Sequence, residues 1–283
     1  MAFKFLGNRK KDDRAEMSFV DHLDELRKHL IRAVIAIVIC MVIVGINNKY
    51  IIDRIILGPT HEDFFSFRKI CEWGHQLGMG DKMCISNIGI NMQNTETTGQ
   101  ISLFFIVLFI GGFILAFPYV FWQFWQFVRP ALTKKELHKT RGVIFWVSFL
   151  FFLGVLFGYF FITPFSMNFM ATFSMSDKIQ NIWTIKSYIN TILPLVLGTG
   201  LAFQMPLVIY FLARIGIVSA GFLRKNRKYA IVVILVIAAV ITPPDVISQV
   251  VVALPLLALY EISIGLTKRV EKEKAKEEAL EWS

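Results

Sequence analysis

Four side chains in one stretch of the sequence could form a covalent cross-link or bind a metal. Cys71 and Cys84 lie between the first two long apolar segments, together with His61 and His75. The histidines lack the tight spacing to the cysteines that metal-ligand sets show, so we expect no metal site here. In an oxidising compartment the two thiols could form a disulfide, whereas two free thiols would be equally ordinary. The sequence leaves both states open, because it does not show whether the two α-carbons approach closely enough.

Two polar side chains interrupt apolar runs, where a polar group is costly enough to suggest a function. Gln204 lies just before Pro206 and can form hydrogen bonds, although an amide cannot relay a proton. Glu261 precedes Lys268 and Arg269 by two helical turns, so we expect it to pair locally or to reach the interface. The sequence contains no nucleophile–base pair, metal-ligand spacing or phosphate-binding glycine loop. We therefore expect neither an enzyme nor a bound cofactor.

The elements that position these residues are expected to be membrane-spanning helices. Hydrophobic residues make up 55% of the 283 residues and charged residues only 18%, against about 25% charged residues in soluble domains. The apolar residues form long continuous runs without the alternation of a β-barrel. The sequence predicts an all-α integral membrane protein with six transmembrane helices, at about 30–46, 101–117, 142–163, 191–212, 229–241 and 246–266.

Prolines indicate where several of these helices end or bend. Pro118 follows the second helix, Pro164 follows the third, and the segment Thr242-Pro243-Pro244-Asp245 separates the fifth from the sixth. Proline removes a backbone donor and clashes with the preceding turn, so we expect helix ends at these points. Pro194 and Pro206 fall inside the fourth helix, where we expect a kink.

Lengths add two further expectations. The loop 48–100 is too long to be a bare connection, and its stretch 50–57 is typical of an amphipathic helix that ends near Pro59 and caps the outer ends of the bundle. The fifth and sixth helices are expected to be short. The fifth has 13 residues, or about 20 Å, against a hydrocarbon core of about 30 Å. We therefore expect the bilayer to be thinned beside this pair.

The distribution of Lys and Arg predicts the orientation. Of the 30 basic residues, 23 lie on one side of the predicted helices and 7 on the other, although the two sets of segments are nearly equal in length. The richer side is expected in the cytoplasm, with both termini. This rule also accounts for the net charge of +9, so we infer a lipid bilayer and no nucleic-acid partner. We divide the chain into a cytoplasmic amphipathic segment (1–29), a membrane domain (30–266) and a charged cytoplasmic tail, helical or disordered (267–283).

Four ordered motifs resemble the TatC subunits of the twin-arginine protein translocase. They are His22-Leu23-x-Glu25-Leu26-Arg27; the aromatic run 121–132 with Lys135-Glu136; Gly154-x-x-Phe157-x-Tyr159-Phe160 with Pro164; and the basic block 223–229 followed by Thr242-Pro243-Pro244-Asp245 and Ser248-Gln249. Each motif alone is weak. Together they occur in the family's order and between the same predicted helices, over about residues 18–266.

The resemblance implies a receptor and core translocation subunit of the cytoplasmic (inner) membrane. Such a subunit binds twin-arginine signal peptides, supports export of folded proteins driven by the proton gradient, and forms oligomers with single-helix subunits of the TatA/TatB type. The alternative is a polytopic small-solute transporter, which usually needs ionisable groups near the midplane. These are nearly absent here, and at Gln204, where many family members have a glutamate, the side chain is neutral.

By resemblance, the signal-peptide site contains Glu25, Arg27, Phe127 and Glu136. A planar guanidinium suits bidentate binding to a carboxylate, and lysine should substitute poorly for it. Structural interpretations stand beside these roles. Glu25 and Arg27 also fit a solvated helix face, Thr133 and Glu136 fit a capping box, and Phe127 fits an interfacial aromatic belt.

Overall fold

The computed structural model describes residues 19–61, 64–76, 92–128, 142–174, 176 and 182–281. Within these ranges all the regular secondary structure is helical apart from one isolated bridge between Gln93 and Thr184. The predicted all-α integral membrane protein is therefore confirmed. The elements are α1 (Phe19–Ile46), α2 (Asn48–Tyr50), η1 (Ile51–Ile56), η2 (Gly58–Thr60), α3 (Phe65–Gln76), α4 (Gly99–Val128), α6 (Val143–Phe157), η5 (Gly158–Ile162), α7 (Thr163–Thr172), α8 (Ile185–Ala202), α9 (Met205–Arg214), α10 (Ala220–Lys225), α11 (Arg227–Ile241) and α12 (Val246–Glu281).

The membrane crossings follow the predicted order. Among the described residues, five helical segments are long and apolar enough to span a bilayer: Leu23–Ile46, Gly99–Val128, Val143–Thr172, Ile185–Arg214 and Val246–Lys276. The remaining predicted crossing, the fifth in the sequence, is α11, whose 15 residues extend about 22 Å, less than the hydrocarbon core of about 30 Å. The fifth helix in sequence is thus short, as predicted.

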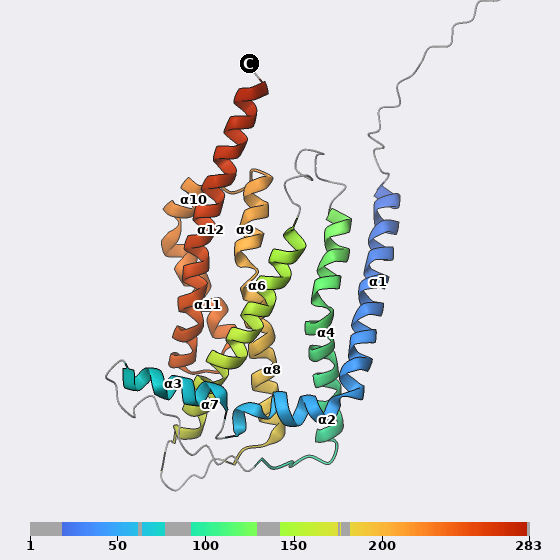
Figure 1. Cartoon of the computed structure of the whole chain (residues 1–283), viewed down its shortest axis with the longest axis vertical. Coiled ribbons are helices and arrows are strands. Elements are labelled where there is room, and N and C mark those ends of the chain that lie inside the picture. Colours follow the sequence, from blue (N-terminus) through green and yellow to red (C-terminus); the bar gives the residue numbers. More distant parts are fainter. Residues whose placement is uncertain are drawn as a thin grey trace, which may run out of the picture.

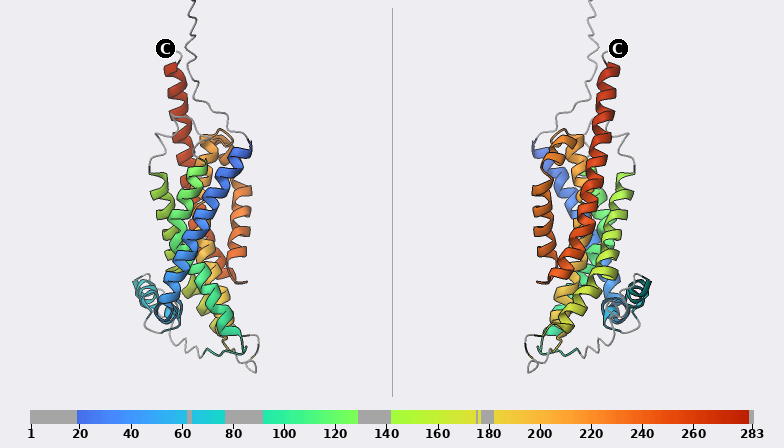
Figure 2. Two further views of the ribbon diagram at one scale, coloured as in Figure 1. Left: turned by 90° about the vertical axis from the view of Figure 1, so that its right-hand side faces the viewer. Right: turned by 90° about the vertical axis from the view of Figure 1, so that its left-hand side faces the viewer.

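The helices stand side by side, with a different surface at each end of the bundle (Figure 1). The start of α1 and the end of α12 lie at one end, which we call the terminal side. At the opposite end, the α3 side, α2 and α3 lie across the bundle, and Figure 2 shows α3 projecting from one flank there. Helix α1 packs along α4, α6 along α8, and α12 along α9 and α11.

Two of the predicted helix ends are wrong. Helix α4 passes through Pro118 to Val128, and the third crossing continues past Pro164 to Thr172. An interrupted helix in an apolar surrounding leaves backbone groups without partners, so the chain keeps its helical bonds. Before Pro164 the chain widens into the π-helical turn η5, and Thr163 Oγ1 donates to the carbonyl oxygen of Gly158 at 3.0 Å. The helix therefore continues from η5 into α7 and does not end at the proline.

The fourth crossing bends as predicted, and the sixth differs from its prediction. Helix α8 runs through Pro194 and ends at Ala202, and α9 begins at Met205 with Pro206 in its first turn. Helix α12, expected to be short, has 36 residues. Its charged end continues the helix because glutamate and lysine are good helix formers and alternate along it. The chain therefore has no break at residue 266, nor at residue 29 inside α1.

Close packing in the centre depends on glycine. A Cβ on Gly154 of α6 would lie 2.9 Å from the Cα of Gly200 on α8, closer than real Cβ contacts allow. The absence of side chains at both positions lets the two helices approach with their backbones. The buried core around this contact includes Phe151, which stacks on Phe117 with ring centroids 3.6 Å apart.

Candidate functional site

One hydrogen bond joins α1 to α4 near the terminal side. Gln123 Oε1 accepts from Nδ1 of His29 at 2.7 Å, and Gln123 is only 3% exposed. A buried amide needs such a partner, because leaving it unpaired in an apolar surrounding is costly. Sequence reasoning missed this pair. The sequence does indicate it in one respect, because Gln123 is a polar residue within the aromatic run that precedes Phe127.

Glu25 and Phe127 extend this contact by one turn toward the terminal side. Glu25 lies four residues before His29 on α1, and Phe127 lies four residues after Gln123 on α4. Residues four apart share a helix face, and the two helices are antiparallel, so both side chains belong to the same α1–α4 seam. We call these four residues the seam site. Glu25 is half-buried there.

The other charged residues around Glu25 lie away from the seam. Arg27 is exposed, and its two-residue offset from Glu25 rotates it by about 200° around the helix, onto another face. Asp24 is also exposed and forms an ion pair with Lys28 at 3.1 Å. Two of the four predicted recognition residues thus share the seam, and Arg27 does not. The fourth, Glu136, lies outside the described residues.

The aromatic run that enters this site is divided between core and surface. Trp125 is buried, and its ring centroid lies 5.1 Å from that of Phe211 on α9. Trp122 and Phe124 are exposed. The belt interpretation therefore does not fit every aromatic residue, since Phe117 and Trp125 pack inside the bundle.

Gln204 links the bend of the fourth crossing to the third. Its Nε2 donates to the carbonyl oxygen of Val147 on α6 at 3.2 Å. Its Oε1 is buried and has no hydrogen-bond partner among the described residues. The side chain thus holds α6 against the α8–α9 turn, and one acceptor faces the interior.

The predicted structural residues lie toward the α3 side. Pro59 and Pro164 are buried in the first turns of η2 and α7. Asp245 is 3% exposed and caps α12, because its Oδ1 accepts from the backbone N–H of Ser248 at 2.5 Å. The Ser248 hydroxyl lies 2.7 Å from that of Ser166 on α7. These contacts fasten the start of α12 to the third crossing.

The remaining chemistry-bearing residues have ordinary partners. Cys71 is disulfide-bonded and Cys40 is free, while Cys84, with which the sequence allowed a disulfide or a free thiol, lies outside the described residues. In the described part of the chain, no group of three His, Cys, Asp or Glu side chains could hold a metal ion. Glu261 pairs with Arg227 of α11 at 2.7 Å instead of with the basic residues that follow it. Those residues lie farther along α12, whereas α11 packs directly beside it.

The sequence and the fold both match known proteins. Residues 21–255 match the family described as "Sec-independent protein translocase protein (TatC)". The chain is 41% identical over 269 residues to the Sec-independent protein translocase protein TatC of Blattabacterium sp. subsp. Periplaneta americana, covering 93% of this chain and 100% of that protein. It is 33% identical over 264 residues to TatCy of Bacillus subtilis, covering 93% and 94%. A crystal structure of the twin-arginine translocase receptor TatC in DDM superposes with a TM-score of 0.69 at 32% identity, covering 87% of this chain and 99% of that one.

Proposed function

Because this chain belongs to the TatC family of Sec-independent protein translocases, we propose that it is the receptor and core translocation subunit for proteins with twin-arginine signal peptides. It is a multi-pass membrane protein of protein transport, and not an enzyme. In this proposal the terminal side faces the cytoplasm, where 23 of the 30 basic residues would lie. The export of folded cargo across the cytoplasmic membrane is driven by the proton gradient.

The position of Glu25 supports this proposal more than any other observation. Its carboxylate is half-buried in the α1–α4 seam at the terminal side, while the neighbouring Asp24 is paired with Lys28. A half-buried carboxylate can bind a guanidinium in a fixed geometry, and the planar fork of arginine matches its two oxygens. We propose that Glu25 binds one arginine of the pair and that Glu136, in the segment that follows α4 in the sequence, binds the other. Phe127 offers an apolar contact beside them.

The later steps use the interior of the bundle and other subunits. The apolar segment of the signal peptide would move along the interior near Gln204, whose free Oε1 can accept a hydrogen bond without carrying charge. Single-helix subunits of the TatA/TatB type would then assemble with an oligomer of this chain and allow cargo to pass. The chain itself contributes recognition, and its sequence has no nucleotide-binding motif.

A binding experiment with the full chain in detergent tests the receptor role. A fluorescent twin-arginine signal peptide should bind, and its twin-lysine version should bind at least tenfold more weakly, because a lysine ammonium cannot form the bidentate pair. Glu25→Gln should reduce binding of the twin-arginine peptide to the level of the twin-lysine peptide. Asp24→Asn is the matched control, since Asp24 is the adjacent acid and is exposed. Equal binding of both peptides by the unmodified chain would contradict the proposal.

Export in cells separates recognition from folding. Glu25→Ala and Glu136→Ala should abolish or sharply reduce the export of a twin-arginine cargo, while the amount of protein in the membrane stays near normal. Loss of the protein itself would instead support a structural role, such as a helix cap at Glu136.

A further inference from the structure

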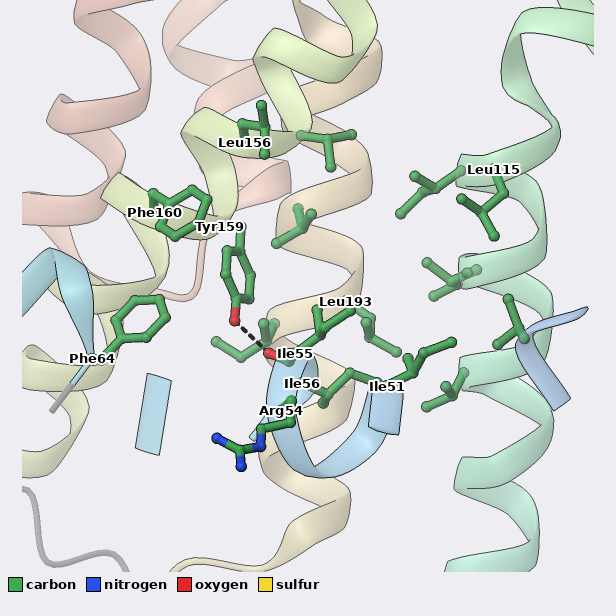
Figure 3. A pocket seen from close by; sticks show the side chains of 18 residues that line it. Ile51, Arg54, Ile55, Ile56, Phe64, Leu115, Leu156, Tyr159, Phe160 and Leu193 are labelled. Carbon is green, nitrogen blue, oxygen red and sulfur yellow. Dashed lines mark hydrogen bonds between the residues drawn. The ribbon is translucent and has the colours of Figure 1, made fainter. Parts of the chain in front are cut away.

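A cavity opens in the half of the bundle nearer the α3 side (Figure 3). It has a volume of about 560 Å³ and lies between α4 and the third crossing, with α8 behind it and η1 below. Toward the terminal side these two crossings are held together by the stacked rings of Phe117 and Phe151. The cavity lies where they separate, and it is only partly enclosed. Among its polar lining atoms, the Tyr159 hydroxyl is already used, because it donates to the carbonyl oxygen of Ile55.

The cavity has the depth of one leaflet of a bilayer. Its wall on α4 runs from Val107 to Leu115, about 12 Å along the helix axis. One half of a hydrocarbon core of about 30 Å is about 15 Å. The remaining walls are almost entirely aliphatic or aromatic, for example Leu156 and Phe160 of the third crossing. Such walls suit a chain that has no hydrogen-bonding groups of its own.

Among the described residues that line the cavity, Arg54 is the one charged residue, and it lies on η1 at the α3 side (Figure 3). Its side chain is exposed, and no carboxylate among the described residues lies within ion-pair distance. This places an unpaired guanidinium at the level where lipid headgroups meet the bilayer. A guanidinium binds phosphate oxygens well, and two parallel hydrogen bonds make the pair directional.

We propose that this cavity binds one phospholipid from the leaflet on the α3 side, with an acyl chain along α4 and the phosphate on Arg54. The proposal combines three observations. The cavity is only partly enclosed, its depth matches a single leaflet, and the one cation among the described residues that line it lies where the phosphate would lie. The bound acyl chain fills the space between the second and third crossings and gives their apolar side chains packing partners. This binding site is separate from the seam site, which lies on the opposite side of the bundle.

Native mass spectrometry of the delipidated full chain in detergent tests the proposal, with phosphatidylglycerol and a diacylglycerol of the same acyl chains as probes. Phosphatidylglycerol should form a 1:1 complex, and Arg54→Gln should weaken it about tenfold, because a charge-assisted hydrogen bond is lost. The diacylglycerol, which has no phosphate, should bind the unmodified chain about as weakly as phosphatidylglycerol binds Arg54→Gln. Arg68→Gln is the matched control, since Arg68 is an exposed arginine on α3 that does not line the cavity.

A second pair of variants tests the acyl-chain site. Leu156→Trp places an indole in the cavity and should abolish the 1:1 complex. Leu153→Trp, one turn earlier on α6 and outside the lining, should leave it intact. Both leucines are about half exposed, at 51% and 44%, so both variants should fold, and twin-arginine peptide binding verifies this. Retention of the lipid by Leu156→Trp, equal binding of both lipids, or one-for-one displacement of the lipid by a signal peptide would overturn the proposal.

Discussion

The two ends of the helix bundle are held together in different ways. On the α3 side, two tyrosine hydroxyls, those of Tyr159 and Tyr188, donate to the consecutive carbonyl oxygens of Ile55 and Ile56. Tyr188 is 1% exposed, so this contact is closed to water. On the terminal side, the only side-chain hydrogen bond between α1 and α4 in the described part of the chain is that of the His29–Gln123 pair, and the charged residues of α1 around it lie mostly exposed.

The difference indicates that the contacts of η1 maintain the fold, whereas the α1–α4 seam is available to a ligand. The turn η1 departs from a regular α-helix, and irregular backbone near a bilayer needs partners for its carbonyl groups. The tyrosines supply these partners. The seam site carries two half-buried polar side chains, Glu25 and His29, on few contacts, as expected of a surface that must accept and release a peptide. Substitutions at the two ends should therefore separate stability from binding.

Removing both tyrosine hydroxyls should have the largest effect on stability. Tyr159→Phe with Tyr188→Phe leaves the carbonyl oxygens of Ile55 and Ile56 without these donors, which we expect to lower the free energy of unfolding by about 2 to 6 kcal/mol. Denaturation in detergent measures this change. Binding of the twin-arginine peptide should not change. Tyr119→Phe is the control, because the Tyr119 side chain is partly exposed and its hydroxyl has no hydrogen-bond partner among the described residues. If the double variant lost peptide binding without losing stability, the assignment of stability to the η1 contacts and of binding to the seam site would be contradicted.

Removing the cap of α12 should have the next largest effect. Asp245→Ala takes away the acceptor for the Ser248 backbone N–H and should lower the free energy of unfolding by about 1 to 2 kcal/mol. Asp245→Asn keeps an acceptor at the same position and should lower it less. The same denaturation measurement compares the two. An equal loss in both variants would show that the negative charge of Asp245, and not its capping bond, stabilises this end.

Breaking the seam should affect binding more than stability. His29→Ala removes the partner of the buried Gln123 amide, which should lower the free energy of unfolding by about 1 kcal/mol. Peptide affinity should fall several-fold, because Glu25 is positioned one turn away on the same face of α1. Parallel titration and denaturation of one sample measure both quantities. Unchanged affinity would show that the seam is not part of the receptor surface.

The exposed pair beside the seam should contribute least. Lys28→Ala removes the ion pair with Asp24, and exposed pairs four residues apart on a helix contribute only about 0.3 to 0.5 kcal/mol. The free energy of unfolding should therefore change by less than about 0.5 kcal/mol. When the denaturation measurement is repeated at a second salt concentration, the change caused by Lys28→Ala should stay below the same limit. A larger change would mean that the charges of α1 also stabilise the terminal side.

Much of the membrane topology could be predicted from the sequence, because long apolar runs allow little besides helices. Besides the length of α12, the errors lie at Pro118 and Pro164, where local rules predicted ends and the apolar surrounding kept the helix intact. The rule for proline describes the cost of a lost bond, and that cost is smaller than the cost of leaving an interrupted backbone without partners in a membrane.

The contacts of the site depend on pairings between distant segments, which single-sequence reasoning does not reveal. His29 and Gln123 are 94 residues apart, and Tyr188 lies 132 residues from Ile56. The sequence motifs pointed to Glu25 and Phe127, but only the antiparallel packing of α1 on α4 places them in one seam. Glu261 shows the same limit, since its partner belongs to the neighbouring helix and not to its own.

Helix α12 continues beyond the bilayer. Its 36 residues measure about 54 Å, so about 24 Å projects past a hydrocarbon core of about 30 Å. Glu273 pairs with the buried Arg214 at 3.5 Å, and Glu271 accepts from the backbone N–H of Ala220 at 2.8 Å, which fixes the base of this projection to α9 and α10. A fluorescent protein fused after this helix would therefore stand off the lipid surface on a rigid spacer, at a height that changes with each turn deleted.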